Sequence, residues 1–506
     1  MILRDYRATP LPVAANVVYS SFPMSRPDIL LVMTDQQRRD QVGYESGGFF
    51  ETPALDALAA RGVVFRSAYS VASTCVPARI GLLTGVQPSR LPRRRPTFAL
   101  EPGVWTVAHA LRAEGYETAL IGKMHFHPIH ADHGFDLIRT SEHLAASMHA
   151  LTANGSPDID DYHQWLVDEG VAKWRLLEVG GAPELERIPP GTGTTAPFPY
   201  DIRFHPTTWI ENEVELFLNG RRRDRPLFLV VSFPHPHPPL NPLDPYASRY
   251  RPEDVNISLT GFDVNEGLPA PFVEALMGGT VRFGSWRVAN HGEAALRDRI
   301  TKVRALVRHI DDVLSRILER FPLDRTLVAF TSDHGDYGGN RGLASKVPWI
   351  PFDDLIRVPL VVAGCDVAHG RRVDALVQSS DLAVTFCDVA GIDIPHEEFD
   401  ARSLWPFLSE SAPRVDVDRS ALFLANPGWP GVRCGALKLI EDHVSGARAM
   451  FDIEQDPDET VNLSDDCERR DDLGRLHDTI WKAMRRRAPQ LPSFGARAAI
   501  GSATDQ

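Results

Sequence analysis

A short stretch near the amino end of the chain places a thiol, a rigid proline and a guanidinium within five residues, as Cys75, Pro77 and Arg79. The apolar residues of 80–83 predict that a helix begins here, with a hydroxyl residue at 73 or 74 as its cap. Cys75 would then lie where backbone N–H groups and the helix dipole favour an anion, and Arg79 would share its helix face. A lone cysteine is more often a buried packing residue, so this stretch predicts a reactive site only if other polar residues join it.

Two polar pairs stand directly after continuous apolar runs. The pairs are Asp35 with Gln36 and Asp333 with His334, and the runs are residues 29–33 and 326–331. Such runs predict strands that are buried on both faces of a parallel sheet, and ligands bind beyond the carboxyl ends of such strands. A single aspartate in this position often only caps a turn. Two such pairs on adjacent strands would instead supply the ligands of a metal site.

A lysine and a histidine follow a third strand. Lys123 and His125 come just after the apolar run 118–121, and in extended geometry residues i and i+2 point the same way. A cation beside an imidazole suits an oxyanion and a leaving group. The alternative is a surface lysine and an unrelated histidine.

A proline-rich loop carries two more histidines. His235 and His237 stand within residues 234–239, directly after the apolar run 227–233. Proline fixes φ and removes hydrogen-bond donors, so this loop should be stiff and should aim its histidines. A packed or solvent-facing position is at least as common for His235 as a place in the pocket, and the loop by itself does not choose between the two histidines.

Composition and charge restrict the function classes. The 506 residues carry a formal net charge of −13, which argues against nucleic acid or an anionic membrane as the main partner. The five cysteines form no close pair, so we expect neither a disulfide scaffold nor a structural zinc site. No apolar run is long enough to span a bilayer, and residues 11–19 make a poor signal peptide, so we expect a cytoplasmic protein.

The elements that must position these side chains are expected to form a large domain and a small one. We expect a loose extension over 1–24, an α/β catalytic domain over 25–411, a subdomain over 412–490 and a flexible tail over 491–506. Apolar residues recur at spacings of three and four from 293 to 321, which predicts a long amphipathic helix. Short apolar runs and a helical pattern after residue 412 predict an antiparallel sheet with one helix.

In combination and in chain order, these motifs resemble those of the formylglycine-dependent sulfatases of the alkaline phosphatase superfamily. Residues 75–79 fit C-x-P-x-R, residues 122–125 fit G-K-x-H, and residues 332–335 fit S-D-H-G. The resemblance implies an α/β fold in which helices sandwich a large mixed sheet, with a small carboxyl-terminal α+β subdomain. The Asp-Gln pair at the first strand resembles choline sulfatases and phosphonate monoester hydrolases in particular. The implied activity is hydrolysis of sulfate monoesters.

The resemblance also implies roles for individual residues. Cys75 would be oxidised to formylglycine by a formylglycine-generating enzyme, and its hydrated aldehyde would attack sulfur. One divalent cation would be held by Asp35, Gln36, Asp333, His334 and the diol derived from Cys75. The remaining catalytic set would be Arg79, Lys123, His125, His237 and Lys346. In this reading His237 protonates the leaving alcohol, His125 takes a proton from the diol, and Arg79 holds the formylglycine loop.

The sequence leaves the cation and the ester open. Oxygen ligands suit Ca²⁺, the first choice by resemblance, and a ligating imidazole favours Mn²⁺, the second choice. We expect a small anionic ester as substrate and neither a nucleic acid nor a membrane partner, and we leave a homo-oligomer open. The main alternative is a phosphonate monoester or phosphodiester hydrolase using the same site. A two-zinc phosphatase would leave Cys75 idle, and a non-catalytic binding protein would not need the complete polar set.

Overall fold

Eight strands form one mixed sheet in the order β10-β2-β9-β7-β1-β5-β3-β4. In that order they span Arg371–Gln378, Gly62–Tyr69, Leu360–Gly364, Thr326–Ser332, Asp28–Asp35, Leu227–Pro236, Glu117–Gly122 and Leu137–Thr140. Strand β9 runs antiparallel to both neighbours, and the other pairs are parallel. The structure, a computed structural model, describes residues 26–91, 100–101, 103–126, 128–142, 159–171, 198, 200–256, 267–278, 286–409, 419–423, 425–426 and 428–491. The predicted large mixed sheet is confirmed.

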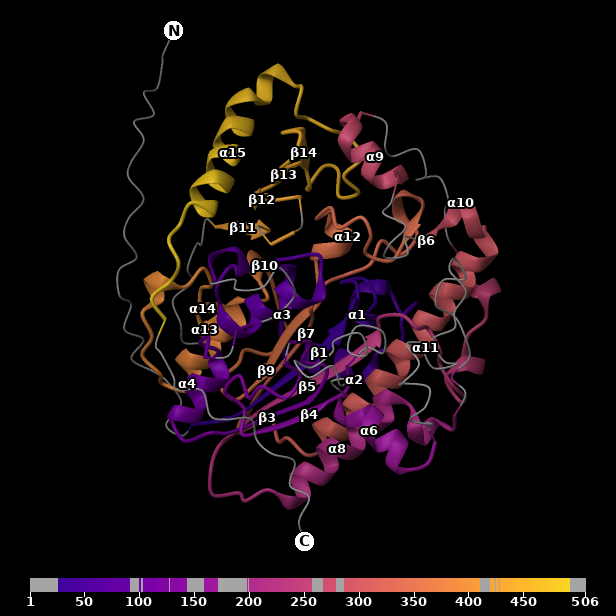
Figure 1. Cartoon of the computed structure of the whole chain (residues 1–506), viewed down its shortest axis with the longest axis vertical. Helices are drawn as coiled ribbons and strands as arrows, with labels where there is room; N and C mark the ends of the chain where they lie inside the picture. The colour runs from indigo at the N-terminus through magenta and orange to yellow at the C-terminus, as the bar shows by residue number, and fades with distance from the viewer. Residues whose placement is uncertain are drawn as a thin grey trace.

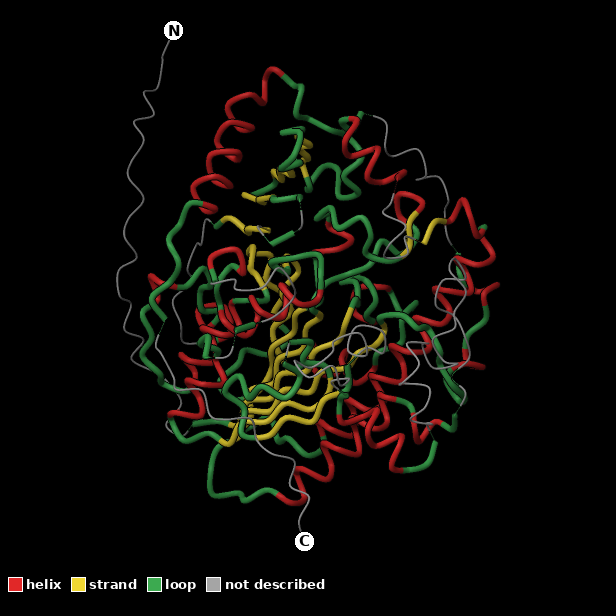
Figure 2. Tube along the Cα trace, in the orientation of Figure 1, coloured by secondary structure: helices red, strands yellow, loops and turns green. Residues whose placement is uncertain are grey.

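Helices cover both faces of this sheet (Figures 1 and 2). One layer contains α3 (Cys75–Thr84), α4 (Val107–Ala113), α13 (Asp381–Val389) and α14 (Trp405–Leu408). The other contains α2 (Pro53–Ala60), α6 (Asp161–Asp168), α8 (Pro206–Gly220) and α11 (Glu293–Leu318). Side chains of β1 alternate between the layers: Ile29 and Leu31 join the first core cluster, and Leu30 and Val32 join the second. Because both faces are covered, residues 29–33 of β1 are all apolar.

Shorter elements connect the layers. They are α1 (Gly43–Ser46), α9 (Ala270–Gly278), α10 (Val288–His291), α12 (Asp353–Ile356), β6 (Trp286–Arg287) and β8 (Leu343–Ala344). The stretch from 200 to 225 contributes a longer helix. Helix α8 from this stretch buries Trp209, Ile210 and Val214 against the sheet, so it belongs to the core.

A second, smaller sheet lies near the carboxyl end, beside the last helix (Figure 1). Its antiparallel strands run in the order β11 (Ser420–Phe423), β12 (Gly431–Cys434), β13 (Leu437–Glu441) and β14 (Arg448–Asp452). Helix α15 (Arg470–Met484) packs Leu476 and Ile480 against this sheet. The predicted antiparallel sheet with one helix is therefore confirmed. The expected boundary at 412, the extension over 1–24 and residues 492–506 of the tail lie outside the described residues.

A buried cluster of charges joins the small sheet to the main domain. Lys438 Nζ on β13 lies 2.8 Å from Asp353 Oδ1 and 2.7 Å from Glu459 Oε1. Tyr69 at the end of β2 donates a hydrogen bond of 2.8 Å to the other oxygen of Asp353. Burial raises the pKa of Glu459 to about 7, although Lys438 acts in the opposite direction. The Lys438 ammonium thus pairs with both carboxylates, and burial shifts the pKa of Glu459 upward.

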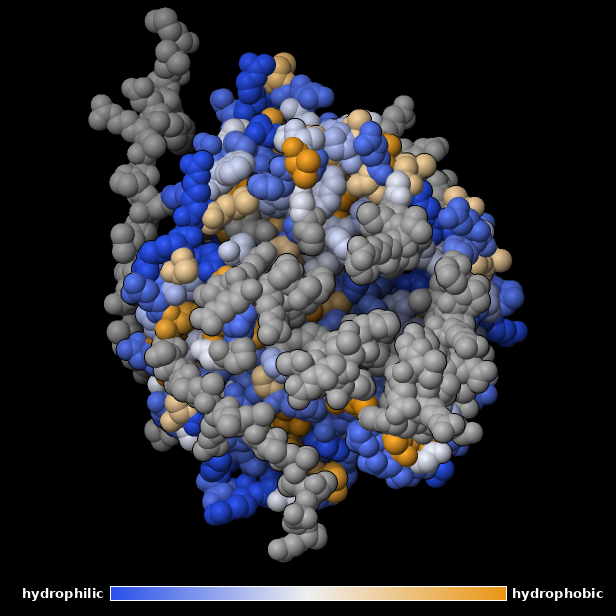
Figure 3. Space-filling model, in the orientation of Figure 1, coloured by the Kyte–Doolittle hydropathy of each residue, from blue (hydrophilic) through white to orange (hydrophobic). Residues whose placement is uncertain are grey.

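The helices and the surface both bear on the requirements of a membrane span. Among the described residues, none of the helices has both the length and the apolar character that a membrane span requires. Figure 3 shows that described residues of one face are mostly hydrophilic, with hydrophobic side chains in small separate groups.

Candidate active site

The strand ends bring the two predicted polar pairs together. Strand β1 lies beside β7 with Thr34 opposite Ser332, so Asp35 and Asp333 emerge at the same edge of the sheet. Cys75 is the first residue of α3 and is 5% exposed. Its Sγ lies 3.2 Å from His334 Nε2 and 3.7 Å from Asp35 Oδ1. One donor atom from each of these four residues lies within 4.8 Å of the others.

The loop before Cys75 is not held by the predicted helix cap. Thr74 occupies the cap position with an extended backbone, but its side chain makes no capping hydrogen bond. Ser73 is instead held from a distant part of the chain, because its backbone N–H donates to Asn426 Oδ1 at 2.6 Å. Its hydroxyl lies 2.7 Å from the same oxygen and 2.8 Å from the carbonyl of Trp349. A residue after β11 therefore positions the Cys75 loop.

The guanidinium of Arg79 is fully buried and hydrogen-bonds to several groups of the cluster. Its Nε donates to Asp333 Oδ2 at 2.8 Å, and its Nη2 donates to Asp35 Oδ2 at 3.2 Å. Its Nη1 donates to the carbonyl of Lys123 at 2.6 Å and to Ser232 Oγ at 2.9 Å. Planar guanidinium geometry suits this multiple pairing. Arg79 thus fixes the strand ends and does not contact Cys75 through any of these bonds.

Two lysines surround Cys75 with positive charge. Lys123 Nζ lies 2.6 Å from Asp35 Oδ2, and Lys346 Nζ lies 2.7 Å from Cys75 Sγ and 3.3 Å from His334 Nε2. Burial would raise the pKa of Asp35, but Lys123 leads a set of cations that hold it well below its usual range. Burial and Asp35 would also raise the pKa of Cys75, yet Lys346 and Lys123 lower it overall. The pocket therefore favours negative charge at position 75.

Lys123 and His125 both lie close to this cluster, although not for the predicted reason. Strand β3 ends at Gly122, and His125 has a φ of 66°, so the segment is not extended. Glu142 Oε1 holds it by accepting the backbone N–H groups of Met124 at 2.9 Å and His125 at 2.7 Å. Burial, then the charges of Lys123 and Arg79, keep the pKa of His125 well below its ordinary value. Its imidazole is neutral and can accept a proton.

The two histidines of the proline loop occupy different surroundings. His235 is 2% exposed and stacks on His205, with ring centroids 4.7 Å apart. His205 in turn lies 5.0 Å from the ring of His309 on α11. His237 is only half-buried, its Nδ1 lies 2.6 Å from the carbonyl of Pro238, and its charge acts on Asp35. The structure thus packs His235 into the interior and leaves part of His237 accessible.

The donor set fits a divalent cation. Gln36 Oε1 is buried and accepts no hydrogen bond from any described residue. His334 Nδ1 lies 2.8 Å from the carbonyl of Gly335, and because a carbonyl only accepts, Nδ1 carries the hydrogen and Nε2 of the neutral ring keeps its lone pair. Asp35 Oδ1 and Asp333 Oδ1 each lie 3.8 Å from that Nε2. Two carboxylates, an amide oxygen and an imidazole suit Ca²⁺ or Mn²⁺.

Four supporting residues were not predicted. They are Glu142, Ser232, Asp336 and Asn426, which hold His125, Arg79, Gln36 and Ser73 respectively. Asp336 could have been noticed as an acid two residues after His334 in S-D-H-G-D. Local sequence around Glu142 and Asn426 offers no comparable signal, because their partners lie far away along the chain.

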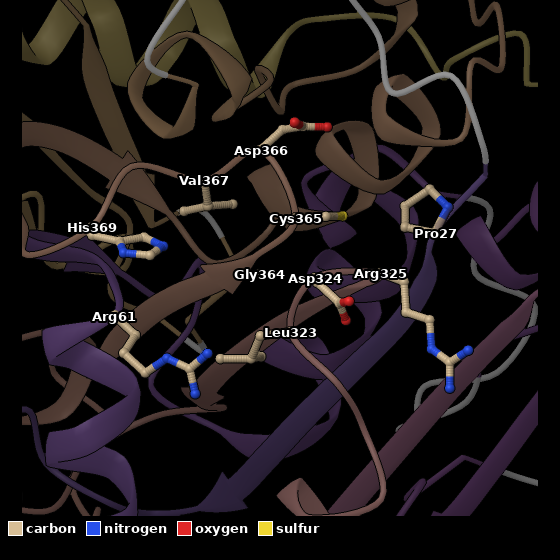
Figure 4. Close-up of a pocket in the computed structure, with 10 residues that line it drawn as sticks. All are labelled: Pro27, Arg61, Leu323, Asp324, Arg325, Gly364, Cys365, Asp366, Val367 and His369. Atoms are coloured by element: carbon tan, nitrogen blue, oxygen red, sulfur yellow. The ribbon is translucent and has the colours of Figure 1, made fainter.

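A separate cavity lies away from this cluster. It encloses about 400 Å³ and is lined in part by Pro27, Arg325 and Cys365 (Figure 4). Pro27 precedes β1 and Arg325 precedes β7, so this cavity lies at the amino ends of the strands whose carboxyl ends carry the cluster. Burial raises the pKa of Cys365 to about 11, which leaves its thiol protonated. None of the residues assigned to the chemistry lines it.

Comparisons with known proteins agree with the geometry. A family model described as Sulfatase matches residues 27–392, and one described as N-sulphoglucosamine sulphohydrolase, C-terminal, matches residues 348–486. The chain is 28% identical over 482 residues to an arylsulfatase of Clostridium perfringens, covering 91% of this chain and 94% of that protein. It is 28% identical over 486 residues to a choline-sulfatase of Rhizobium meliloti, covering 93% and 88%. A phosphonate monoester hydrolase of Agrobacterium radiobacter shares the fold, with a TM-score of 0.70, 22% identity and coverage of 90% and 95%.

Proposed function

The chain belongs to the sulfatase family of sulfuric ester hydrolases, and on that premise we propose that it cleaves sulfate monoesters with a formylglycine made from Cys75 and one divalent cation. The observation that carries the proposal is the environment of Cys75 Sγ. It lies 2.7 Å from an ammonium and 3.2 Å from an imidazole, beside two buried carboxylates. A nucleophile at this point would meet cations for the substrate's oxygens and donors for a metal.

The proposed modification concerns only the side chain of residue 75. Oxidation of Cβ by two electrons with loss of the sulfur would convert the thiol into an aldehyde, a step assigned to a formylglycine-generating enzyme. Cys75 is the cysteine that the pocket singles out, because Lys346 and Lys123 lower its pKa. The pKa values of Cys365 and Cys387 are raised by burial instead.

The cation would be held by Asp35, Gln36, Asp333 and His334, with side chain 75 as a further neighbour. Ca²⁺ is the first choice because three of the four donors are oxygens, and Mn²⁺ is the second because the fourth is an imidazole. When bound, such a cation supplies Lewis acidity that lowers the pKa of a coordinated hydroxyl and stabilises negative charge. Arg79 keeps Asp35 and Asp333 in place by pairing with the oxygens that face away from His334.

The chain's own cations and imidazoles would perform the remaining steps. Lys123 pairs with Asp35 and Lys346 contacts Cys75, and both would stabilise charge on the non-bridging sulfate oxygens. His237 would protonate the leaving alcohol through Nε2, since its ring is partly accessible and its Nδ1 lies 2.6 Å from the carbonyl of Pro238. His125, held neutral by burial and by nearby cations, would accept a proton from side chain 75 as sulfate leaves.

A phosphonate monoester or phosphodiester hydrolase is the second candidate. The same cations and donors would serve a tetrahedral phosphorus, and the fold likeness to the phosphonate monoester hydrolase supports this alternative. A small anionic ester is the substrate in either case. Location in the cytoplasm and assembly into a homo-oligomer stay predictions from the sequence.

A substrate panel on matured enzyme tests the proposal. The protein is co-expressed with a formylglycine-generating enzyme, and mass spectrometry of the peptide that carries Cys75 measures its conversion. We expect kcat/KM to be higher for nitrophenyl sulfate than for phenyl phosphonate or phosphodiester analogues, and to be lost in Cys75→Ala. Higher turnover of the phosphorus esters would select the second candidate. Full sulfatase activity with an unmodified thiol would remove formylglycine from the proposal.

A further inference from the structure

We propose that Asp336 is a positioning residue that orients the side-chain amide of Gln36, so that the amide oxygen faces the cation site. This inference rests on the proposed function, because it concerns the cation that Asp35, Asp333 and His334 would hold. It adds an acid outside the cation's direct ligands and explains why position 36 carries an amide.

The contacts of Gln36 leave one orientation. The residue directly follows β1 with a φ of 65°, is 3% exposed, and donates its backbone N–H to Asp333 Oδ1 at 3.1 Å. Its side-chain Nε2 donates to Asp336 Oδ2. A carboxylate only accepts hydrogen bonds, so the NH₂ end of the amide must face Asp336 and the oxygen must face away. That oxygen is the buried Oε1 without a hydrogen bond among the described residues.

The opposite orientation would be unfavourable at both ends. It would set the amide oxygen against the carboxylate of Asp336, and it would turn the NH₂ group toward the donors of the cation site. An amide flip of this kind is decided by the hydrogen-bond partners, since oxygen and nitrogen have nearly the same shape. Asp336 is the partner that decides it.

Asp336 itself cannot turn away. Its Oδ1 accepts the backbone N–H of Gly338 at 2.6 Å and that of Ser345 at 3.1 Å. Arg299 of α11 lies 3.3 Å from Oδ2 through Nη2. The acid is 6% exposed. Because Ser345 precedes Lys346, the same carboxylate also fixes the turn that brings Lys346 to Cys75.

The arrangement also sets the charge of the cation site. With an amide at position 36, Asp35 and Asp333 are the two carboxylates among the four donors. An acid at position 36 would stand directly against Asp336, and two carboxylates at that distance repel each other strongly when buried. Asp336 therefore favours Gln36 over an acidic residue.

Three variants separate orientation from other effects. Asp336→Asn removes the acceptor and lets the Gln36 amide turn, and Gln36→Glu sets two acids against each other. We expect each to weaken binding of Ca²⁺ and Mn²⁺, measured by isothermal titration calorimetry, by roughly 10–100-fold. The double variant Gln36→Glu/Asp336→Asn restores one N–H donor facing one carboxylate, now with their positions exchanged. We expect it to bind both cations at least as tightly as the unsubstituted protein.

The rescue distinguishes positioning from a general loss of structure. Thermal unfolding in chelator reports any damage to the Arg299 and Ser345 contacts, which the double variant shares with Asp336→Asn. Unchanged affinity in Asp336→Asn, or a double variant as weak as the sum of the single ones, overturns the inference. Asp333→Ala should abolish binding: if it does so while Asp336→Asn has no effect, the proposed cation site stands and the inference falls. If the unsubstituted protein binds neither cation, both fail.

Discussion

Arg79 should be the main electrostatic support of the strand ends, and its removal can be given a magnitude. Arg79→Met leaves Asp35 with Lys123 at 2.6 Å, but it takes from Asp333 the guanidinium at 2.8 Å. Opposite charges about 4 Å apart attract by about 4 kcal/mol at an effective dielectric constant of about 20. Breaking a buried pair by removing one partner costs about 3–5 kcal/mol, because the other charge stays buried. We therefore expect the free energy of unfolding to fall by about 3–5 kcal/mol.

The companion variant Asp333→Asn tests whether the unpaired charge of Asp333 causes the loss of stability in Arg79→Met. Alone it should cost about 1–3 kcal/mol, since Arg79 keeps Asp35 as a partner. Added to Arg79→Met, it should cost almost nothing further, because it removes the uncompensated carboxylate. The expected coupling energy is about 2 kcal/mol, within the range found for residues in direct contact.

Urea unfolding of all four proteins in chelator measures this cycle, and the chelator keeps cations from replacing the lost guanidinium. Arg316→Met is the matched control, since Arg316 pairs with Glu211 at the surface and its side chain is 50% exposed. It should cost less than about 1 kcal/mol. Additivity of Arg79→Met and Asp333→Asn within about 0.5 kcal/mol would refute the reasoning.

Four further outcomes are expected. His237→Ala should lower kcat/KM about 10²–10⁴-fold on an aliphatic sulfate ester and less on nitrophenyl sulfate, because only the poor leaving group needs the proton; equal losses on both would remove His237 as the acid. His235→Asn should lower the melting temperature and leave the ratio of the two substrates unchanged, since its ring is packed in the interior. Asn426→Ala should destabilise the protein by about 1–3 kcal/mol in urea, because it strands the buried N–H of Ser73; an unchanged midpoint would contradict that role. Glu459 has a folded-state pKa of about 7 against a reference of 4.5, so its contribution to stability is full below pH 4.5 and is lost as pH rises through 7. Unfolding at pH 5 and pH 8 should therefore show a smaller loss of stability for Glu459→Gln than for the unsubstituted protein, and parallel losses would argue against this assignment.

The residues at the strand ends could be predicted because the hydrophobic pattern of the strands and their parallel pairing are enough to place them. The apolar runs before Asp35 and Asp333 indicate strands buried on both faces, and parallel neighbours bring their carboxyl ends to one edge. The spacing of Cys75 and Arg79 likewise predicts a shared helix face. Arg79 hydrogen-bonds to Asp333 at the strand ends, and its expected role of holding the loop stays a prediction.

Other features depend on contacts that local pattern does not encode. His125 adopts a left-handed backbone because Glu142 accepts two N–H groups at that turn, and nothing near position 125 indicates this. Ser73 is held by Asn426 rather than by a cap within its own helix, since a long-range acceptor replaces the local one.

The order of the strands in the main sheet determines how late Cys75 can be enclosed while the chain is being synthesised. Strand β1 is among the first elements made, yet its neighbours β5 and β7 begin at Leu227 and Thr326. Ribosomes add about 5–20 residues per second, so the roughly 300 residues from β1 to β7 take about 15–60 s. Cys75 cannot be enclosed before its contacts His334 and Lys346 exist. If Cys75 is modified as proposed, the formylglycine-generating enzyme would have that interval in which to reach a thiol that the finished protein leaves 5% exposed.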